Sequence, residues 1–143
     1  MVSEVGTYLD AQFATLTLGS TLFLGQMPEA PDTACALYQG SGGRPSFTLG
    51  AEDAVAQRPQ WESFRLQVVV RTADSATSYT DSETLIWSIY RALSLTNITM
   101  SGIRYLSIDP IDIPAPLEED KKGRISFVCN FEVLREPSTG SNQ

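Results

Sequence analysis

The chain has 143 residues, a formal charge of −7 and a sequence pI near 4.4. This length is enough for a sizeable core, and an apolar fraction of 42% excludes wholesale disorder. With ten Lys and Arg against 17 Asp and Glu, the chain lacks the basic face that nucleic-acid binding requires, and no apolar run is long enough to span a membrane.

The first forty residues predict one helix and two short strands. Apolar residues recur at spacings of three and four over residues 3–14, which predicts an amphipathic helix with Ser3 as its N-cap. Short apolar runs at 21–24 and 34–39 predict strands, and the prolines between them exclude regular structure there. Glu4 interrupts any signal-peptide pattern, so we expect a soluble protein.

Residues 40–60, "GSGGRPSFTLGAEDAVAQRPQ", predict a long, adaptable loop. The segment is rich in Gly and Ser at its start and shows little periodicity. A loop of this length inside a compact domain is usually functional, or disordered until it is bound.

Residues 62–72 give the clearest strand, because apolar and more polar side chains alternate along it. One face would carry Phe64, Leu66, Val68 and Val70, and the other Arg65, Gln67, Val69 and Arg71. A helix is expected at about 75–93, capped by Asp74 or Ser75. Its apolar stripe would consist of Tyr79, Leu85, Ile86, Ile89, Tyr90 and Leu93.

The C-terminal part predicts three more strands. Residues 97–100 and 103–109 form a hairpin turning at Ser101-Gly102, and residues 125–134 form a last strand. The pattern predicts an α+β fold with a mostly antiparallel β-sheet and two main α-helices packed on one face. We expect one domain over residues 1–135 and a disordered tail over 136–143.

Catalytic and metal-binding patterns are scarce. Histidine is absent, which removes the most versatile general base and the commonest metal ligand. Cys35 and Cys129 lie in apolar strand-like runs without a CxxC partner, so we expect buried, reduced thiols and no zinc site. No cofactor is expected.

The acidic and glycine-rich segments favour structural roles. Asp109 and Asp112 could be paired carboxylates or ligands of a hard cation, but aspartates flanked by proline more often cap turns. Residues 118–122 fit a solvated turn better than a calcium loop. "GSGGR" lacks the ending of a phosphate-binding loop.

Arg71, just before a helix start, allows two interpretations. It could bind an anion at the helix N-terminus, or, together with Arg65, pair with carboxylates across strands or across subunits. Because no catalytic partner accompanies it, we favour the second interpretation. Trp87, on the predicted helix, would pack against the sheet or against a neighbouring chain.

Three stretches together resemble the siphophage tail terminator proteins, a tail-completion family often labelled minor capsid proteins. The first is "TYL" followed by "STLFLGQMPEAPDTACALYQ", and the second is "RPQWESFRLQVVVRTADSATSYTDSETLIWSIYRAL". The third is "GIRYLSI" with the closing strand "ISFVCNFEV". The likeness covers about residues 3–134 and rests on the order and spacing of the three stretches.

The resemblance implies a non-enzymatic virion protein at the tail–neck junction, assembled in the host cytoplasm. Such proteins form a ring, usually a hexamer, that caps the tail tube, stops its polymerisation and meets the head-completion protein, while DNA passes through the lumen without specific binding. The expected contact surfaces, on subunits or on the major tail tube protein, are Gly40, Ser41, Gly42, Gly43, Arg44, Arg65, Arg71, Asp74, Trp87 and Tyr90. No membrane is involved.

Three alternatives stay open at this point. One is a head-completion or stopper ring protein of the neck. Another is a small enzyme or anion-binding domain that uses Arg71 and the following helix N-terminus. The third is an α+β interaction module of a bacterial host.

Overall fold

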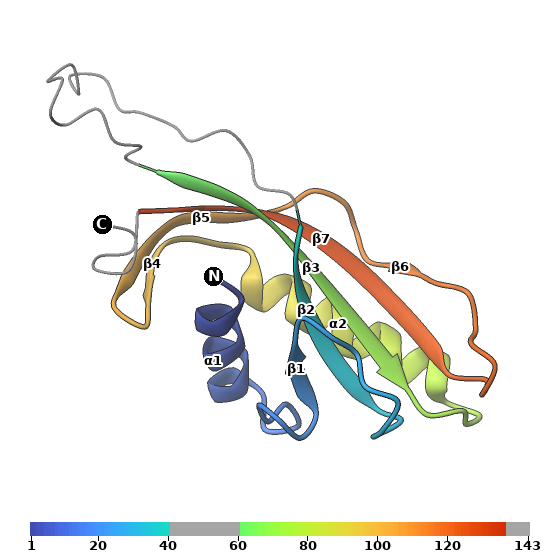
Figure 1. The fold of residues 1–143 in the computed structure, drawn as a ribbon. Coiled ribbons are helices and arrows are strands. Elements are labelled where there is room, and N and C mark those ends of the chain that lie inside the picture. Colours follow the sequence, from blue (N-terminus) through green and yellow to red (C-terminus); the bar gives the residue numbers. More distant parts are fainter. Residues whose placement is uncertain (41–60, 137–143) are drawn as a thin grey trace, which may run out of the picture.

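The computed structural model describes residues 1–40 and 61–136, and Figure 1 shows how their elements are arranged. The elements in chain order are α1 (Val2–Gln12), β1 (Leu22–Leu24), β2 (Ala34–Gly40), β3 (Glu62–Thr72), α2 (Ser78–Leu93), β4 (Leu95–Met100), β5 (Ile103–Pro110), β6 (Ala115–Pro116) and β7 (Ile125–Arg135). Both helices lie on the same side of one sheet (Figure 1). The predicted α+β fold is confirmed.

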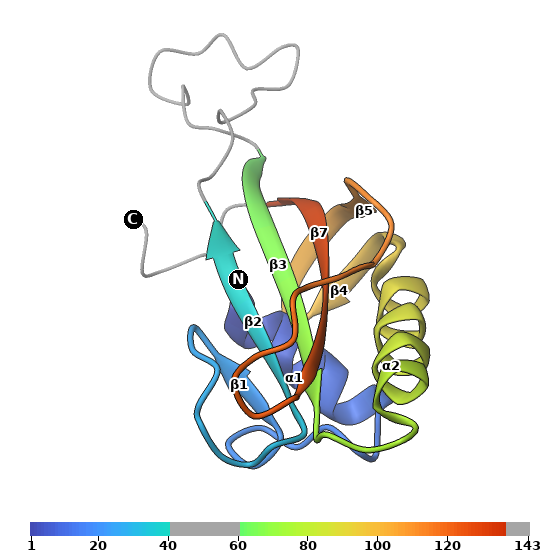
Figure 2. The same cartoon turned by 90° about the vertical axis from the view of Figure 1, so that its right-hand side faces the viewer.

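The sheet has the strand order β1-β2-β3-β7-β5-β4, and β6 also pairs with β7. Among the strands that the structure describes, β1 and β2 run parallel and the other pairs are antiparallel. The central pair is β3 and β7, which stay in register from Glu62↔Arg135 to Thr72↔Ile125. Figure 2 shows β1 and β2 at one side of this pair and β5 with α2 at the other. β7 therefore joins the two halves of the sheet.

The core lies between the sheet and the helices. Because successive strand residues point to opposite faces, every second residue of β3 and β7 is turned toward the helices. The buried side chains of this layer include Leu66, Val68 and Val70 of β3, Phe127, Cys129, Phe131 and Val133 of β7, and Ile86, Ile89 and Leu93 of α2. The alternation predicted for residues 62–72 is confirmed at the three buried β3 positions.

Both helices begin differently from the prediction. Helix α1 starts at Val2 after Met1, so Ser3 lies inside the helix and is not its cap. Helix α2 starts at Ser78 after Thr77, and neither Asp74 nor Ser75 caps it. Ser75 instead accepts a hydrogen bond from the Thr77 backbone N–H at 3.3 Å. The residues before α2 thus form a separate turn, which short polar side chains favour.

The buried side of α2 begins with serines, not with Tyr79. Tyr79 is 51% exposed and makes an edge contact with Phe127 of the sheet, at 5.1 Å between ring centroids. Ser82 is fully buried, where its hydroxyl contacts Thr72 Oγ1 and lies 3.3 Å from the carbonyl oxygen of Ile125. A polar contact therefore anchors the first turns of α2, whereas apolar packing begins at Ile86.

The predicted hairpin at Ser101-Gly102 is confirmed. Both turn residues have positive φ, 50° at Ser101 and 80° at Gly102, and the strands pair as Met100↔Ile103. Two consecutive positive φ values belong to a type I′ turn, whose twist matches that of the flanking strands.

The two cysteines are buried and free, as predicted. Cys35 on β2 is paired in register with Val70, and Cys129 on β7 is paired with Val68. Strand β3 therefore lies between the two residues, and two strand spacings with an offset of two residues put their Cα atoms roughly 11–12 Å apart, which is too far for a disulfide.

Candidate interaction surfaces

Arg71 is held inside the chain. It is 6% exposed, and its Nε donates to the carbonyl oxygen of Asp32 at 2.9 Å. Its Nη2 donates to the carbonyl oxygens of Pro28, at 2.8 Å, and Pro31, at 2.6 Å. The prediction that Arg71 projects from an exposed face and pairs with carboxylates is wrong, because three of its five N–H groups hold the 26–33 segment.

A second arginine, Arg124, fixes the same segment. Its Nη1 donates to the carbonyl oxygen of Glu29 at 2.8 Å, and the same nitrogen lies 3.3 Å from a carboxylate oxygen of Asp32. Its Nε donates to Asp120 at 2.7 Å. Hydrogen bonds from Arg124 lower the pKa of the exposed Asp120 carboxyl. This cluster closes one end of the sheet, and sequence reasoning missed it because Arg124 lies more than 90 residues from Glu29 and Asp32.

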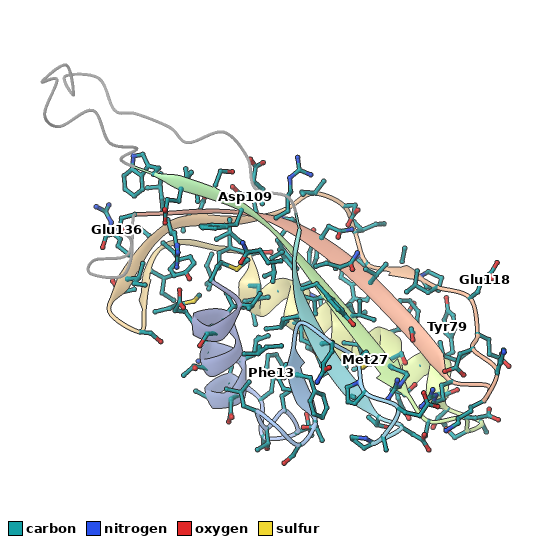
Figure 3. All side chains as sticks on the ribbon, in the orientation of Figure 1. Phe13, Met27, Tyr79, Asp109, Glu118 and Glu136 are labelled. Carbon is teal, nitrogen blue, oxygen red and sulfur yellow. The ribbon has the colours of Figure 1, made fainter. Side chains whose placement is uncertain are left out.

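The 118–122 segment is an exposed turn, as predicted, with a specific internal cap. The Asp120 carboxylate accepts the backbone N–H groups of Lys122, at 2.9 Å, and Arg124, at 3.0 Å. Asp74 lies at the same end, exposed, with its carboxylate packed over Gly123. Figure 3 places Glu118 and Tyr79 at this end and Glu136 at the opposite one.

Arg65 and Gly40 lie on the sheet face that the helices leave uncovered. The two residues are paired in register, and Glu132 is the neighbour of Arg65 on β7. A hollow of about 450 Å³ adjoins them and is lined also by Tyr38, Gln67, Ile111, Asp112 and Asn130. Across its floor Gln67 donates to Asn130 at 3.2 Å, and Asn130 donates to Asp112 at 3.2 Å. The other predicted glycine-loop residues, Ser41, Gly42, Gly43 and Arg44, lie outside the described residues.

Trp87 and Tyr90 lie together on α2. Their rings meet edge to face at 5.1 Å between centroids, and Tyr90 also contacts Phe131 of β7, at 6.3 Å. The guanidinium of Arg91 lies 5.4 Å from the centroid of the Trp87 ring. Trp87 is only partly buried, so α2 presents an aromatic ring and a cation beside each other. Arg91 was not among the predicted residues.

The predicted residues do not form one site. Arg65 lies on the uncovered sheet face, Trp87 and Tyr90 lie on the helix layer, and Arg71 and Asp74 lie at the end closed by Arg124. From Arg65 to Arg71 along β3 the distance is about 20 Å, by the rise per residue of a strand. The predicted contact residues that the structure describes are therefore spread over three separate surfaces.

Sequence reasoning also missed exposed apolar side chains between β5 and β7. Ile111, Ile113 and Leu117 stay in solvent in a segment that the prolines had marked only as a connection. Together with Ala115 they occupy every second position from 111 to 117, which was the available signal.

Metal-ligating side chains are not clustered in the described part of the chain. Among residues 1–40 and 61–136, no three or more Cys, Asp or Glu side chains gather in a way that could hold a metal ion. Neither α1 nor α2 is long and apolar enough to cross a membrane.

The described residues thus form an α+β body that carries several separate exposed surfaces. Comparison with protein-family models makes this specific: the model described as "Bacteriophage tail terminator protein" matches residues 11–137. The chain belongs to the bacteriophage tail terminator family, as the resemblance of its three stretches predicted. No curated protein matches the sequence.

Proposed function

We propose that this protein assembles as a ring, of about six subunits, on the end of the phage tail tube. There it terminates tube polymerisation and joins the tail to the head-completion protein. The observation that carries the proposal is the family match, which covers most of the chain, from residue 11 to residue 137. The proposed role is structural and not enzymatic, and the proposed location is the tail–neck junction of the virion.

The separation of the surfaces supports a ring. A ring closes when one face of each subunit meets a different face of the next. The uncovered sheet face with Arg65 and Glu132 and the helix surface with Trp87 and Arg91 differ in chemistry and come from different layers. Residues 41–44, which lie outside the described part of the chain, are proposed to contact the tube. Deleting residues 41–50 tests this, since unchanged tube capping would remove the contact from the proposal.

The charge balance supports passage of DNA through the ring. The net charge of −7 gives the subunit a repulsive field toward phosphate, so that DNA would not adhere to the lumen on its way out. The anion-binding alternative has no such support, because the Arg71 guanidinium donates to three backbone carbonyl oxygens.

Light scattering with and without purified tail tubes, followed by negative-stain imaging of the mixture, tests the proposal. Particles of about six subunits, or density on one end of the tubes, are the expected result. A monomer that ignores tubes but binds capsids lacking tails would favour the head-completion alternative. A monomer that binds neither would overturn both.

A further inference from the structure

The segment from Pro110 to Leu117, called the proline edge below, leaves apolar side chains in solvent. Ile111 is 45% exposed, Ile113 64% and Leu117 46%. These are three of the five large hydrophobic residues that are exposed in the described part of the chain. Ala115, between them, is exposed as well. The four residues lie within seven positions of one another, and contiguous exposed apolar patches are typical of interaction sites.

The backbone of the proline edge limits what can bind there. Ile111 donates its N–H to Asn130, and Leu117 donates its N–H to Ser126, both at 2.8 Å, so these donors are used within the sheet. Pro110, Pro114 and Pro116 have no N–H to offer. Proline along an edge prevents the addition of another strand. The partner must therefore pack against the side chains, which suits a helix better than a strand.

The charges around the proline edge indicate which charge the partner should carry. Asp109 and Asp112 lie at its start, and the exposed Glu118 and Glu119 follow its end. Two lysines follow. Lys122 is paired with Glu29, with 2.8 Å between Nζ and the carboxylate oxygen, and Lys121 is exposed and belongs to none of the ion pairs found among the described residues, so the four carboxylates outnumber the two cations. A helix that packs on this edge should therefore carry an apolar or aromatic side chain beside a cation.

The C-terminal half of α2 meets this requirement. Trp87 is partly exposed, and the exposed Arg91 lies over its ring at 5.4 Å. None of the ion pairs found among the described residues involves Arg91. The acidic residues of the helix, Asp81 and Glu83, lie in its N-terminal half.

A second aromatic–cation pair fits less well. Arg104 lies 5.7 Å from the ring centroid of Trp61, but its Nε already donates to Asn97 at 2.9 Å. Arg104 lies on β5 and Trp61 lies just before β3, so this pair does not belong to a helix.

We infer that the proline edge of one subunit binds the Trp87–Arg91 surface of α2 from a second copy of the chain. Ile113 and Leu117 pack against Trp87, and Glu118 and Glu119 face Arg91. The inference rests on the proposed function, since it names the subunit contact of the ring. In Figure 1, α2 lies beneath the sheet whereas β6 follows the far side of β7, so the two surfaces belong to different layers. Contact between unlike surfaces is head-to-tail, as ring closure requires.

Cross-linking of two singly substituted, full-length proteins tests the contact. Ile113→Cys labels the proline edge, and Ser88→Cys labels α2 while keeping Trp87 and Arg91. The proteins are mixed, incubated with tail tubes assembled from tube protein that was made without this chain, and treated with a short bis-maleimide. The native cysteines are fully buried and should not react.

The expected result is a cross-linked dimer from the mixture and little from either protein alone. Thr7→Cys, at an exposed position on α1, replaces Ser88→Cys in the matched control. Cross-linking no stronger than with Thr7→Cys would overturn the inference. So would cross-linking of Ile113→Cys with Arg104→Cys in preference to Ser88→Cys.

Charge reversal separates a direct contact from a general effect on folding. Arg91→Glu in the Ser88→Cys protein should weaken the cross-link severalfold. Glu118→Lys with Glu119→Lys in the Ile113→Cys protein should restore it. Circular dichroism checks that both charge-reversed proteins are folded. If they are folded and still do not cross-link, the proposed pairing of Glu118 and Glu119 with Arg91 is wrong.

Negative-stain images of the same mixtures keep the two proposals apart. If the tube ends are capped but Ile113→Cys and Ser88→Cys do not cross-link, the inferred contact is wrong and the proposed function stands. A cross-linked dimer with bare tube ends would support the contact and overturn the proposed function.

Discussion

The Arg135 Nη1 atom lies 2.6 Å from the Oε1 atom of Glu4, although 131 residues separate them in the chain. The same carboxylate oxygen accepts a hydrogen bond from the Tyr105 hydroxyl at 2.8 Å. Arg135 also lies 3.3 Å from Glu62 Oε1, and its guanidinium is 4.7 Å from the centroid of the Phe64 ring. One partly buried carboxylate thus ties α1 to β5 and β7.

Glu4→Gln should destabilise the fold. Glutamine keeps the size of the side chain and an oxygen for Tyr105, but it leaves the buried Arg135 without its closest opposite charge. We expect the free energy of unfolding to fall by about 2 kcal/mol, measured by urea denaturation. Glu119→Gln, at an exposed position, is the control and should change little. Equal stability of the two variants would contradict the structural role of Glu4.

Acid should destabilise the protein, in part by protonating the Glu4 carboxylate. Burial raises the pKa of Glu4, but the Tyr105 hydrogen bond, the N-terminal ammonium and Arg135 outweigh it and hold the pKa below its usual value. A carboxyl with a depressed folded-state pKa stabilises the fold above its unfolded pKa, and this stability is lost as the pH falls through the folded value. Thermal unfolding should therefore shift downward below about pH 4.5, the ordinary Glu value. The drop in unfolding temperature at low pH should be smaller in Glu4→Gln than in the wild type. Equal drops in the two proteins would show that other carboxyl groups cause the acid destabilisation.

Arg71→Lys should loosen the 26–33 segment. A lysine ammonium cannot reproduce the geometry in which Nε and Nη2 reach three carbonyl oxygens. We expect a loss of about 2–3 kcal/mol in unfolding free energy and faster proteolysis between β1 and β2. Arg65→Lys is a matched control on the same strand and the same face, but exposed, and should stay within about 0.5 kcal/mol of the wild type. Similar losses in both variants would contradict this account.

Gly102→Ala should weaken the β4–β5 hairpin. The glycine has a φ of 80°, and an added Cβ would meet no atom within 4 Å, so the cost is one of backbone strain alone. We expect a destabilisation of about 1 kcal/mol. Gly102→Asn should lose less, because asparagine adopts positive φ more readily than alanine. Thermal melts of the two variants measure the difference, and the opposite order would argue against a type I′ turn.

Both thiols should be unreactive in the folded protein. Burial raises the pKa of Cys35 to about 12, and burial followed by the nearby Asp112 charge raises the pKa of Cys129 to about 12. Because the thiolate is the reactive form, labelling with a thiol reagent at pH 8 should be very slow until denaturant is added. Two reactive thiols should then appear. Fast labelling of the native protein would show that this part of the core opens readily.

The elements that sequence reasoning located well are those whose pattern is set by burial. In β3 the alternation from Leu66 to Val70 follows from one face meeting the helices, so the strand bounds could be read directly. The type I′ turn at Ser101-Gly102 could be read because its backbone requires particular residues. The family resemblance followed from the order of such segments.

The features that sequence reasoning missed depend on distant partners. Arg71 looks like an outward residue of β3, and only the folded chain brings the carbonyl oxygens of Pro28 and Pro31 to its guanidinium. The buried side of α2 was misassigned at its first turns because Ser82 is buried by its contacts with Thr72 and Ile125, which no helical pattern predicts. The proline edge was taken for a simple connection, since its prolines hid the alternation of Ile111, Ile113 and Leu117.

The position of β7 has a consequence for synthesis in the infected cell. The β1-β2-β3 half of the sheet and the β5-β4 half are joined only through β7, and β6 pairs with β7 alone. A nascent chain whose residues 125–135 are still inside the ribosome therefore holds two separate pieces of sheet. The proline edge has no strand to lie against until β7 emerges, so an incomplete chain lacks this surface. Completion of β7 therefore decides when the two pieces become one sheet.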